Sequence, residues 1–325
     1  MDMYLQLIGG LIILLIAAEA MVRGAVILAD KMGVSPMVIG MTVVAFGTSA
    51  PELVVSLQAS MQGSPGLAIG NIVGSNIANV WLILGAACLV MPILAKPAAM
   101  PRDIALLAGG TVIFSIMCLF GAVDRVSGVI LLVIFAGFIF ASYFRGQDDP
   151  DVLEEHAEEL AELEKGVPKN VPVAFALTVG GIVGLAFGAD LLVDGGSAIA
   201  RSYGVSEEVI GLTLLAFGTS LPELAASVVA AYRGHPDVAI GNVIGSNVFN
   251  MMLVGGLVAV VTGLQVPDQV IGFDIWVMLF ATLMLMPVLL GWVKLNRGVA
   301  AVSFLLYVGY ISAQAYGVDR LLASV

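Results

Sequence analysis

Two glutamates, Glu52 and Glu223, lie within apolar stretches of this sequence, where a carboxylate is costly to place. Each ends a Gly-Thr-Ser-x-Pro-Glu motif, and the two copies stand 171 residues apart (223 − 52 = 171). Neither glutamate has a basic residue within two helical turns along the chain. A duplicated carboxylate with no basic residue nearby in the sequence predicts a functional site rather than a structural ion pair.

The proline and glycine of each motif predict a break in the helix beside the glutamate. Proline removes a backbone donor and clashes with the preceding turn, and glycine one turn earlier loosens the backbone further. Carbonyls freed in this way must line a cavity or be buried in protein, because hydrocarbon offers them no partner. With hydroxyls and a carboxylate they form a set of hard oxygen ligands that suits Ca²⁺ and also Na⁺. The hydroxyls belong to Thr48, Ser49, Thr219 and Ser220.

A second duplicated motif, Gly-Asn-x-x-Gly-Ser-Asn followed by an Asn three residues later, spans 70–79 and 241–250. On a helix its serine and last asparagine share one face, because they are four residues apart. These pairs are Ser75 with Asn79 and Ser246 with Asn250. The glycines also recur at this spacing, which predicts close helix packing at Gly70, Gly74, Gly241 and Gly245. One face of each helix should pack tightly while a neighbouring face offers neutral oxygens.

Both motifs belong to a longer repeat, in which residues 33–80 match residues 204–251 at 27 of 48 positions without a gap. Hydrophobic residues make up 60% of the chain and charged residues 11%, against about 25% charged in soluble domains. Apolar runs of roughly 20 residues are too long for barrel strands. The composition therefore predicts an all-α polytopic membrane protein, and a duplicated half with broken helices at matching positions is typical of a secondary transporter.

Ten membrane spans are expected, five on each side of an acidic segment. Their approximate limits are 4–30, 36–61, 67–92, 103–121, 126–145, 171–200, 206–232, 238–262, 271–293 and 298–317. The predicted parts are a first five-helix repeat at 1–145, an acidic loop at 146–170 and a second five-helix repeat at 171–325. Because five is odd, the second repeat enters from the opposite side, which makes the two repeats inverted.

The basic residues predict the orientation. With the N-terminus outside, cytoplasmic connections hold nine Lys and Arg residues and external ones hold three. Both termini should then be external and the 146–170 loop cytoplasmic, in what is expected to be a prokaryotic inner membrane. The loop carries nine acids and two lysines, which favours a solvated linker over a regulatory cation site. The first apolar run reads as a span, since it lacks the basic start of a cleavable signal peptide.

Other charged residues in the predicted spans are Glu19 and Arg23, which are spaced to pair, and the aspartates Asp190 and Asp194. Asp190 is the repeat equivalent of Glu19 (19 + 171 = 190). These residues are expected to pair structurally near a water-filled vestibule, with a place along an ion path as the alternative. His235 is expected to be a solvated loop residue.

The paired motifs resemble the two α-repeats of the cation/Ca²⁺ antiporter superfamily, and the whole chain is similar to its bacterial and archaeal Na⁺/Ca²⁺ exchangers. The resemblance implies exchange of Na⁺ for Ca²⁺ by alternating access, with ions bound at the membrane midplane. It implies that the first and sixth spans slide across the cores of the repeats, 33–80 and 204–251.

The resemblance also implies the ligands. Glu52 and Glu223 would be the central Ca²⁺ ligands, helped by the backbone carbonyls of Thr48 and Thr219. Flanking Na⁺ sites would use the backbone carbonyls of Ala45 and Ala216. Further side chains in these sites would be Ser49, Ser220, Ser75, Ser246, Asn79 and Asn250. The chain departs from well-known relatives at Asn250, where they carry aspartate, so its centre has a formal charge of −2 rather than −3.

Two other transport functions remain as alternatives. An H⁺/Ca²⁺ antiporter could load protons on the same glutamates, although the flanking hydroxyls and carbonyls would then be idle. A cation channel usually builds a continuous selectivity pathway from symmetric subunits, which a pseudo-symmetric single chain fits less well. An enzyme is not expected, because no buried histidine, nucleophile pair or metal triad is evident. The expected partners are Ca²⁺, Na⁺ and the lipid bilayer, with no cofactor and no nucleic acid, and the oligomeric state is left open.

Overall fold

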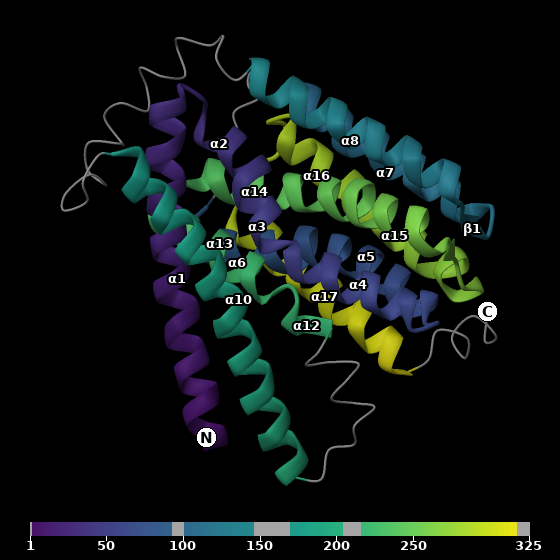
Figure 1. The fold of residues 1–325 in the computed structure, drawn as a ribbon, viewed down its shortest axis with the longest axis horizontal. Helices are drawn as coiled ribbons and strands as arrows, with labels where there is room; N and C mark the ends of the chain where they lie inside the picture. Colours follow the sequence, from purple (N-terminus) through teal and green to yellow (C-terminus); the bar gives the residue numbers. More distant parts are fainter. Residues whose placement is uncertain (1, 93–100, 146–169, 204–215, 317–325) are drawn as a thin grey trace. The chain divides into compact units, whose positions relative to one another are not determined.

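The computed structural model describes residues 2–92, 101–145, 170–203 and 216–316, and these are predominantly helical (Figure 1). The chain divides into two compact units. The first unit comprises Met1–Ser49 and Ile139–Asn242, and the second comprises Ala50–Phe138 and Val243–Val325. Each unit thus contains segments from both predicted repeats. The predicted 146–170 loop lies almost wholly outside the described residues.

Among the described residues, six helices are long and apolar enough to cross a membrane, which confirms the membrane helices. They are Met3–Met32, Pro65–Val90, Val171–Ser202, Pro236–Thr262, Val270–Leu289 and Arg297–Tyr316. The interrupted pair Met37–Thr48 and Ala50–Met61 also qualifies when taken together. Three further apolar helices, Asp103–Leu119, Arg125–Phe140 and Leu221–Tyr232, are shorter. These segments coincide with the predicted spans, while the number of membrane crossings stays a prediction.

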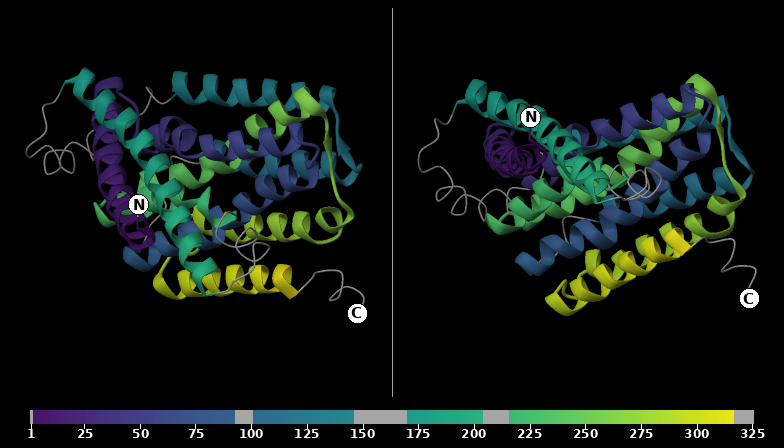
Figure 2. Two further views of the ribbon diagram at one scale, coloured as in Figure 1. Left: turned by 60° about the horizontal axis from the view of Figure 1, so that its bottom comes forward. Right: turned by 90° about the horizontal axis from the view of Figure 1, so that it is seen from below.

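The first unit is dominated by two long helices, α1 (Met3–Met32) and α10 (Val171–Ser202), which lie side by side (Figures 1 and 2). Each begins with a side-chain cap, because Asp2 accepts from the Tyr4 N–H and Asn170 accepts from the Val173 N–H. α1 ends at Gly33, whose φ of 65° is left-handed and favours glycine. At 1.5 Å per residue, 30 and 32 residues give lengths of about 45 and 48 Å, which exceed the hydrocarbon core.

Glycines make the contact between α1 and α10 close. A Cβ placed on Gly10 would lie 2.6 Å from the backbone nitrogen of Leu192, and one on Gly181 would lie 2.6 Å from that of Met21. Gly195 approaches Leu7 in the same way. The two helices are antiparallel, since residues near the start of α1 meet residues near the end of α10. Without a hydrophobic driving force between lipid-solvated helices, such small-residue packing is what holds them together.

The rest of the first unit consists of short helical segments. These are α2 (Pro36–Ile39), the π-helical stretch η1 (Gly40–Val44), α3 (Ala45–Thr48), α12 (Ala216–Gly218), α13 (Leu221–Tyr232) and the start of α14 (Pro236–Val248). The predicted close packing at Gly241 is confirmed, because a Cβ there would lie 2.5 Å from the carbonyl oxygen of Met37. Gly70 and Gly74 have no described neighbour this close. The repeat equivalent of Met37 is residue 208, which lies outside the described residues.

The second unit holds most of the remaining helices. They are α4 (Ala50–Met61), α5 (Pro65–Ala78), η2 (Asn79–Ile83), α6 (Leu84–Val90), α7 (Pro101–Leu119), α8 (Arg125–Arg145, largely in this unit), η5 (Phe249–Val254), α15 (Gly255–Thr262), η6 (Val270–Asp274), α16 (Ile275–Leu289) and α17 (Arg297–Tyr316). α5 packs against α4 and α16, while α17 packs against α6 and η2. Ile72, Ile77 and Ile83 are fully buried in this core.

A small antiparallel ladder departs from the predicted all-α fold. Strand β1 (Ala122–Val123) pairs with β2 (Leu264–Gln265), with Ala122 opposite Gln265. The two strands lie in the connections between predicted spans four and five and between spans eight and nine. Each strand has only two residues, which is too short for a periodic pattern in the sequence to reveal it.

Two π-helical stretches follow the second motif at equivalent positions. η2 begins at Asn79 and η5 at Phe249, one residue before Asn250, and their ends Ile83 and Val254 are repeat equivalents (83 + 171 = 254). A π-helical turn widens the helix and shifts the side chains that follow it, and such turns are frequent at functional sites. The second motif therefore ends in both copies at a point where the helix is locally remodelled.

Candidate ion-binding site

In the first unit, a residue of one motif copy contacts the glutamate of the other. The hydroxyl of Ser49 donates to Oε1 of Glu223 at 2.9 Å, across 174 positions of sequence. Ser49 ends α3 and Glu223 lies in the first turn of α13, where the helix dipole favours a negative charge. Both side chains are buried, with Glu223 only 1% exposed. Within the described residues, Oε2 of Glu223 has no hydrogen-bond partner.

A second polar chain runs beside this contact. The Thr48 hydroxyl donates to Oδ1 of Asn242 at 3.2 Å, and Nδ2 of Asn242 donates to the hydroxyl of Ser227 at 3.0 Å. Ser227 stands one helical turn after Glu223 on α13. Asn242 therefore ties the end of α3 to the helix that carries Glu223, and it fixes the orientation of both.

The helix breaks predicted at the prolines are present in both motif copies. In the first copy, α3 and α4 are separated by Ser49. In the second copy, α12 and α13 are separated by Thr219 and Ser220. The carbonyl of Ala45 accepts the Ser49 N–H at 3.0 Å, which uses one of its two lone pairs. Ser220 is buried and Thr219 is partly exposed. The repeat equivalent of Ala45, Ala216, is the first residue of α12.

In the second unit, Glu52 lies in the first turn of α4 and is 1% exposed. Nδ2 of Asn71, on α5, donates to the backbone carbonyl of Glu52 at 3.3 Å and to the Ser56 hydroxyl at 3.0 Å. The bond of Asn71 with Ser56 repeats that of Asn242 with Ser227, since each residue of one pair lies 171 positions from its equivalent in the other. Asn71 thus fixes the turn of α4 that carries Glu52.

The four candidate ligands from the second motif also lie in the second unit, and all are buried. They are Ser75, Asn79, Ser246 and Asn250. Nδ2 of Asn79 donates to Oδ1 of Asn247 at 2.9 Å. Among the described residues, Oδ1 of Asn79, the hydroxyl of Ser246 and both side-chain polar atoms of Asn250 have no partner. Buried polar atoms are nearly always paired, so these unused groups are suited to a ligand.

The sequence prediction missed residues that orient the candidate ligands. The partners Ser56, Ser227, Asn71 and Asn242 were not among the predicted site residues, nor were Asn76 and Asn247. Each is identical in both copies of the repeat, and each is polar within an apolar stretch. Those two properties together were a usable signal.

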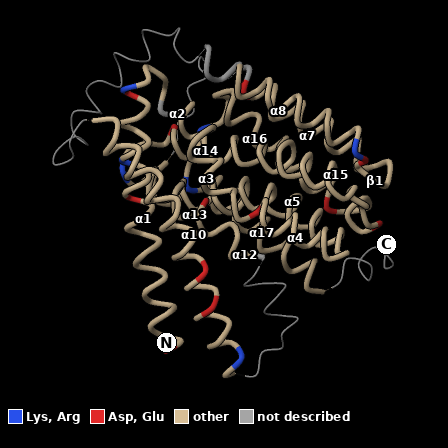
Figure 3. The backbone as a smooth tube through the Cα atoms, in the orientation of Figure 1, with Lys and Arg blue, Asp and Glu red and all other residues tan. Residues whose placement is uncertain are grey.

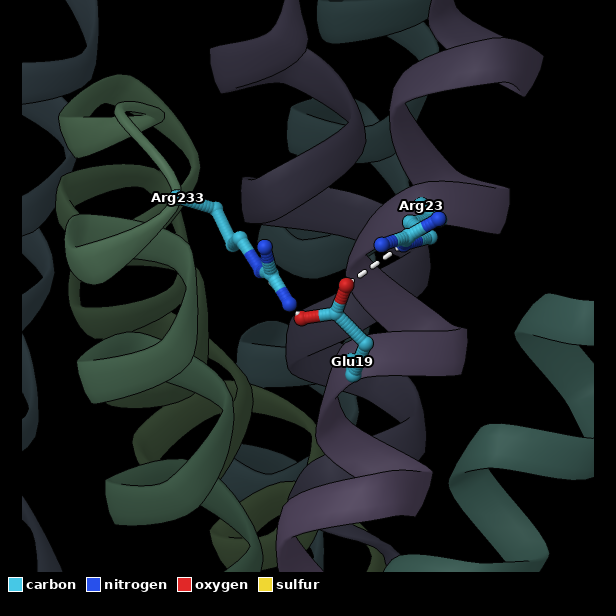
Figure 4. A network of polar contacts seen from close by, with 3 residues as sticks. All are labelled: Glu19, Arg23 and Arg233. Atoms are coloured by element: carbon cyan, nitrogen blue, oxygen red, sulfur yellow. Dashed lines mark hydrogen bonds and ion pairs between the residues drawn. The ribbon is translucent and has the colours of Figure 1, made fainter. Parts of the chain in front are cut away.

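The expected pair of Glu19 and Arg23 is confirmed, and a third residue joins it (Figure 4). Glu19 contacts Arg23 through Oε1 and Arg233 through Oε2, each at 2.5 Å. Arg233 follows α13, so this network ties α1 to the end of that helix. By contrast, Asp190 and Asp194 are exposed on α10. The prediction of a solvated His235 is wrong, because the residue is 6% exposed beside the turn between α13 and α14.

Charge is sparse along the helices, as Figure 3 shows. No group of three or more His, Cys, Asp or Glu side chains is placed to hold a metal ion among the described residues. A cavity of about 380 Å³ lies between α7 and α16, but its walls are apolar and include none of the candidate ligands.

Several known proteins are similar to this chain in sequence, and one of them also in its solved structure. The chain is 37% identical over 311 residues to the putative antiporter CaxA of Alkalimonas amylolytica. The matched region covers 93% of this chain and 95% of that protein. It is 32% identical to the sodium/calcium exchanger MaX1 of Methanosarcina acetivorans, over 96% and 98% of the two chains. The solved structure of the sodium-calcium exchanger NCX_Mj, soaked with Na⁺ and Ca²⁺, matches with a TM-score of 0.82 at 30% identity, covering 96% and 99%.

The model of the sodium/calcium exchanger protein family matches residues 3–144 and 173–316, which is most of both predicted repeats. The duplicated motifs indicate the same family as this match and the full-length relatives do, and the apolar helices are consistent with it. The chain belongs to the sodium/calcium exchanger protein family.

Proposed function

We propose that the protein is an antiporter that exchanges Na⁺ for Ca²⁺ across a membrane. The observation that carries this proposal is the 2.9 Å hydrogen bond between Ser49 and Glu223, which joins the two copies of the ion-binding motif. Glu223 offers a second carboxylate oxygen that no described residue satisfies. Relatives named as an antiporter and as a sodium/calcium exchanger add support.

In this proposal, Glu52 and Glu223 together balance one Ca²⁺ or two Na⁺. The neutral oxygens complete the coordination that hard cations require. They come from the hydroxyls of Ser49, Ser220, Ser75 and Ser246, from Asn79 and Asn250, and from the backbone carbonyls of Thr48, Thr219, Ala45 and Ala216. Because a third carboxylate is missing at Asn250, a third Na⁺ would leave the loaded site positively charged.

We also propose ten spans in two inverted repeats, 1–145 and 171–325, with α-repeat cores at 33–80 and 204–251. The antiparallel packing of α1 and α10 supports inversion, because these helices are repeat equivalents. In the second unit, Ser60 contacts Thr262, β1 pairs with β2, and Cys88 contacts Leu295. The proposed topology puts the two members of each of these three pairs on the same side of the membrane.

Alternating access would then move α1 and α10 as one body, because their backbones are in close contact along the whole seam. The loop 146–170 is proposed to be cytoplasmic and both termini external, in the inner membrane of a prokaryotic cell. The relative YrbG of Escherichia coli, 35% identical over 94% of this chain, is named an inner membrane protein.

The test is Ca²⁺ uptake into proteoliposomes under outward gradients of Na⁺, K⁺ or H⁺, each tried alone. An outward Na⁺ gradient should drive uptake against the Ca²⁺ gradient, and K⁺ should not replace it. Uptake driven only by H⁺ would favour the alternative proton antiporter. Uptake that follows the Ca²⁺ gradient with no counter-ion would instead favour a channel.

A further inference from the structure

Four asparagines from the two copies of the second motif lie in the second unit, and all are nearly inaccessible. Asn76, Asn79, Asn247 and Asn250 are between 0% and 2% exposed. Asn76 is the repeat equivalent of Asn247, and Asn79 is the equivalent of Asn250 (76 + 171 = 247; 79 + 171 = 250). An amide buried this deeply is expected to use its donors and its acceptor.

Only one of two equivalent hydrogen bonds between these asparagines is formed. Nδ2 of Asn79 donates to Oδ1 of Asn247 at 2.9 Å. The equivalent bond would run from Nδ2 of Asn250 to Oδ1 of Asn76. Both of those atoms lack a partner among the described residues, although one is a donor and the other an acceptor. Asn76 instead donates its Nδ2 to the carbonyl of Ile72 within its own helix, at 2.7 Å.

The sequence at these four positions is symmetric, whereas the hydrogen bonding is not. A buried donor and a complementary buried acceptor left apart are unfavourable, so the unformed bond is costly in this conformation. The formed bond holds Asn79 by its amide nitrogen, while its Oδ1 and both polar side-chain atoms of Asn250 have no partner among the described residues. The two candidate ligands therefore differ in how firmly they are oriented.

We propose that Asn76 and Asn247 are positioning residues for Asn250 and Asn79, and that the protein exchanges one of these hydrogen bonds for the other as it alternates between its two conformations. In the described conformation the bond of Asn79 with Asn247 is formed. In the opposite one, the repeats exchange roles, so that Asn250 bonds Asn76 and Asn79 is released. This inference rests on the proposed function, because only a carrier with two opposed states needs both arrangements.

The test compares Asn247→Leu with Asn76→Leu, since leucine has a similar size and cannot form these hydrogen bonds. Asn247→Leu removes the bond of the described conformation, and Asn76→Leu removes the bond of the opposite one. The two variants should therefore shift the balance of the two conformations in opposite directions. Each shift should be roughly fivefold, the factor that one net hydrogen bond is worth.

The first readout is the apparent KM for Ca²⁺ at each face, measured in right-side-out and inside-out vesicles. The fraction of molecules facing one side scales the apparent affinity there, so the ratio of the two KM values reports the balance. We expect the ratio to rise in one variant and fall in the other. Trp81→Phe is the matched control, because it removes the Nε1 of a buried residue in η2, an atom that has no partner among the described residues. A local packing defect of this kind should leave the ratio unchanged.

The second readout needs no transport. Spin labels are attached at two exposed positions, Ile12 on α1 and Leu305 on α17, in a protein with Cys88 and Cys118 replaced by alanine. The distances between the labels report the populations of the two conformations. Opposite shifts of the populations are expected. A shift in the same direction in both variants, or no shift beyond that of Trp81→Phe, would overturn the proposal. Opposite shifts in a protein without Na⁺-driven Ca²⁺ flux would support the positioning roles and refute the proposed function alone.

Discussion

At the scale of single residues, the two buried glutamates carry the charge of the candidate site. Glu52→Gln and Glu223→Gln each leave a divalent ion facing one negative charge in a site of low dielectric constant. Loss of one partner of a buried charge pair costs about 3 kcal/mol or more, so we expect Na⁺-driven Ca²⁺ flux to fall on the order of 100-fold. The measurement is radioactive calcium uptake into proteoliposomes.

The control for these variants is Asp268→Asn, which neutralises an exposed carboxylate away from both motifs. It should keep the flux of the parent protein. Size-exclusion profiles of the glutamate variants should match the parent, because glutamine keeps the shape of glutamate. Near-parental flux in either glutamate variant would show that the carboxylate does not bind the transported ion.

Asn250 is a neutral residue at a position where the resemblance to the family implies a third carboxylate. Asn250→Asp should behave like the parent protein when the new carboxyl is protonated. As the pH rises and this group ionises, a third negative charge should hold Ca²⁺ more tightly and slow its release. We therefore expect the flux of the variant to fall relative to the parent between about pH 6 and about pH 9. Superimposable pH profiles would place residue 250 away from the ions.

At the scale of helices, the glycines between α1 and α10 set how closely two membrane helices approach. A Cβ on Gly181 would lie 2.5 Å from that of Met21, whereas one on Gly180 meets nothing within 4 Å. Gly181→Ala should therefore destabilise the protein by about 1–3 kcal/mol through overpacking. The measurement is thermal unfolding in detergent.

Gly180→Ala is the matched control, because it adds the same methyl group to the same helix at an exposed position. Alanine also has the higher helix propensity, so this variant should be as stable as the parent or slightly more stable. Equal melting temperatures for the two variants would mean that the helices separate at little cost, and that the seam is not a rigid contact.

The helices themselves were predictable from the sequence, whereas their irregular turns were not. Apolar runs located the segments, and the prolines located the breaks beside Glu52 and Glu223. The π-helical stretches η2 and η5 carry no such signal, since a widened turn depends on the helices packed around it. The ladder of β1 and β2 escaped prediction for the same reason, because a contact between two loops leaves no local pattern.

At the scale of the whole molecule, the proposed inverted topology makes a prediction about sidedness. The excess of basic residues predicts a cytoplasmic 146–170 loop and two external termini. Cysteines introduced at Asp149 and Ser324, with Cys88 and Cys118 removed, should be labelled by an impermeant thiol reagent from opposite sides. Labelling of both from one side would require a different number of spans.

The sequence repeat predicted both halves of the candidate site, but it could not predict which bonds form between them. Duplication and polarity identified Glu52, Glu223, Ser49, Ser75, Ser246, Asn79 and Asn250. The hydrogen bond between Asn79 and Asn247 could not be predicted, because the sequence has the same residues at the equivalent positions, Asn250 and Asn76. Packing decides between two arrangements that the sequence describes equally well.

The antiparallel seam of α1 and α10 joins the first proposed five-helix repeat to the second through backbone contacts. Because these contacts do not depend on a covalent connection, the 146–170 loop should be dispensable for assembly. Residues 1–146 and 170–325, expressed together as separate polypeptides, should find each other in the membrane and restore Ca²⁺ uptake. Either fragment alone should be degraded, since its long helix would lack a partner. The molecule would thus behave as a heterodimer whose two subunits happen to be translated from one reading frame.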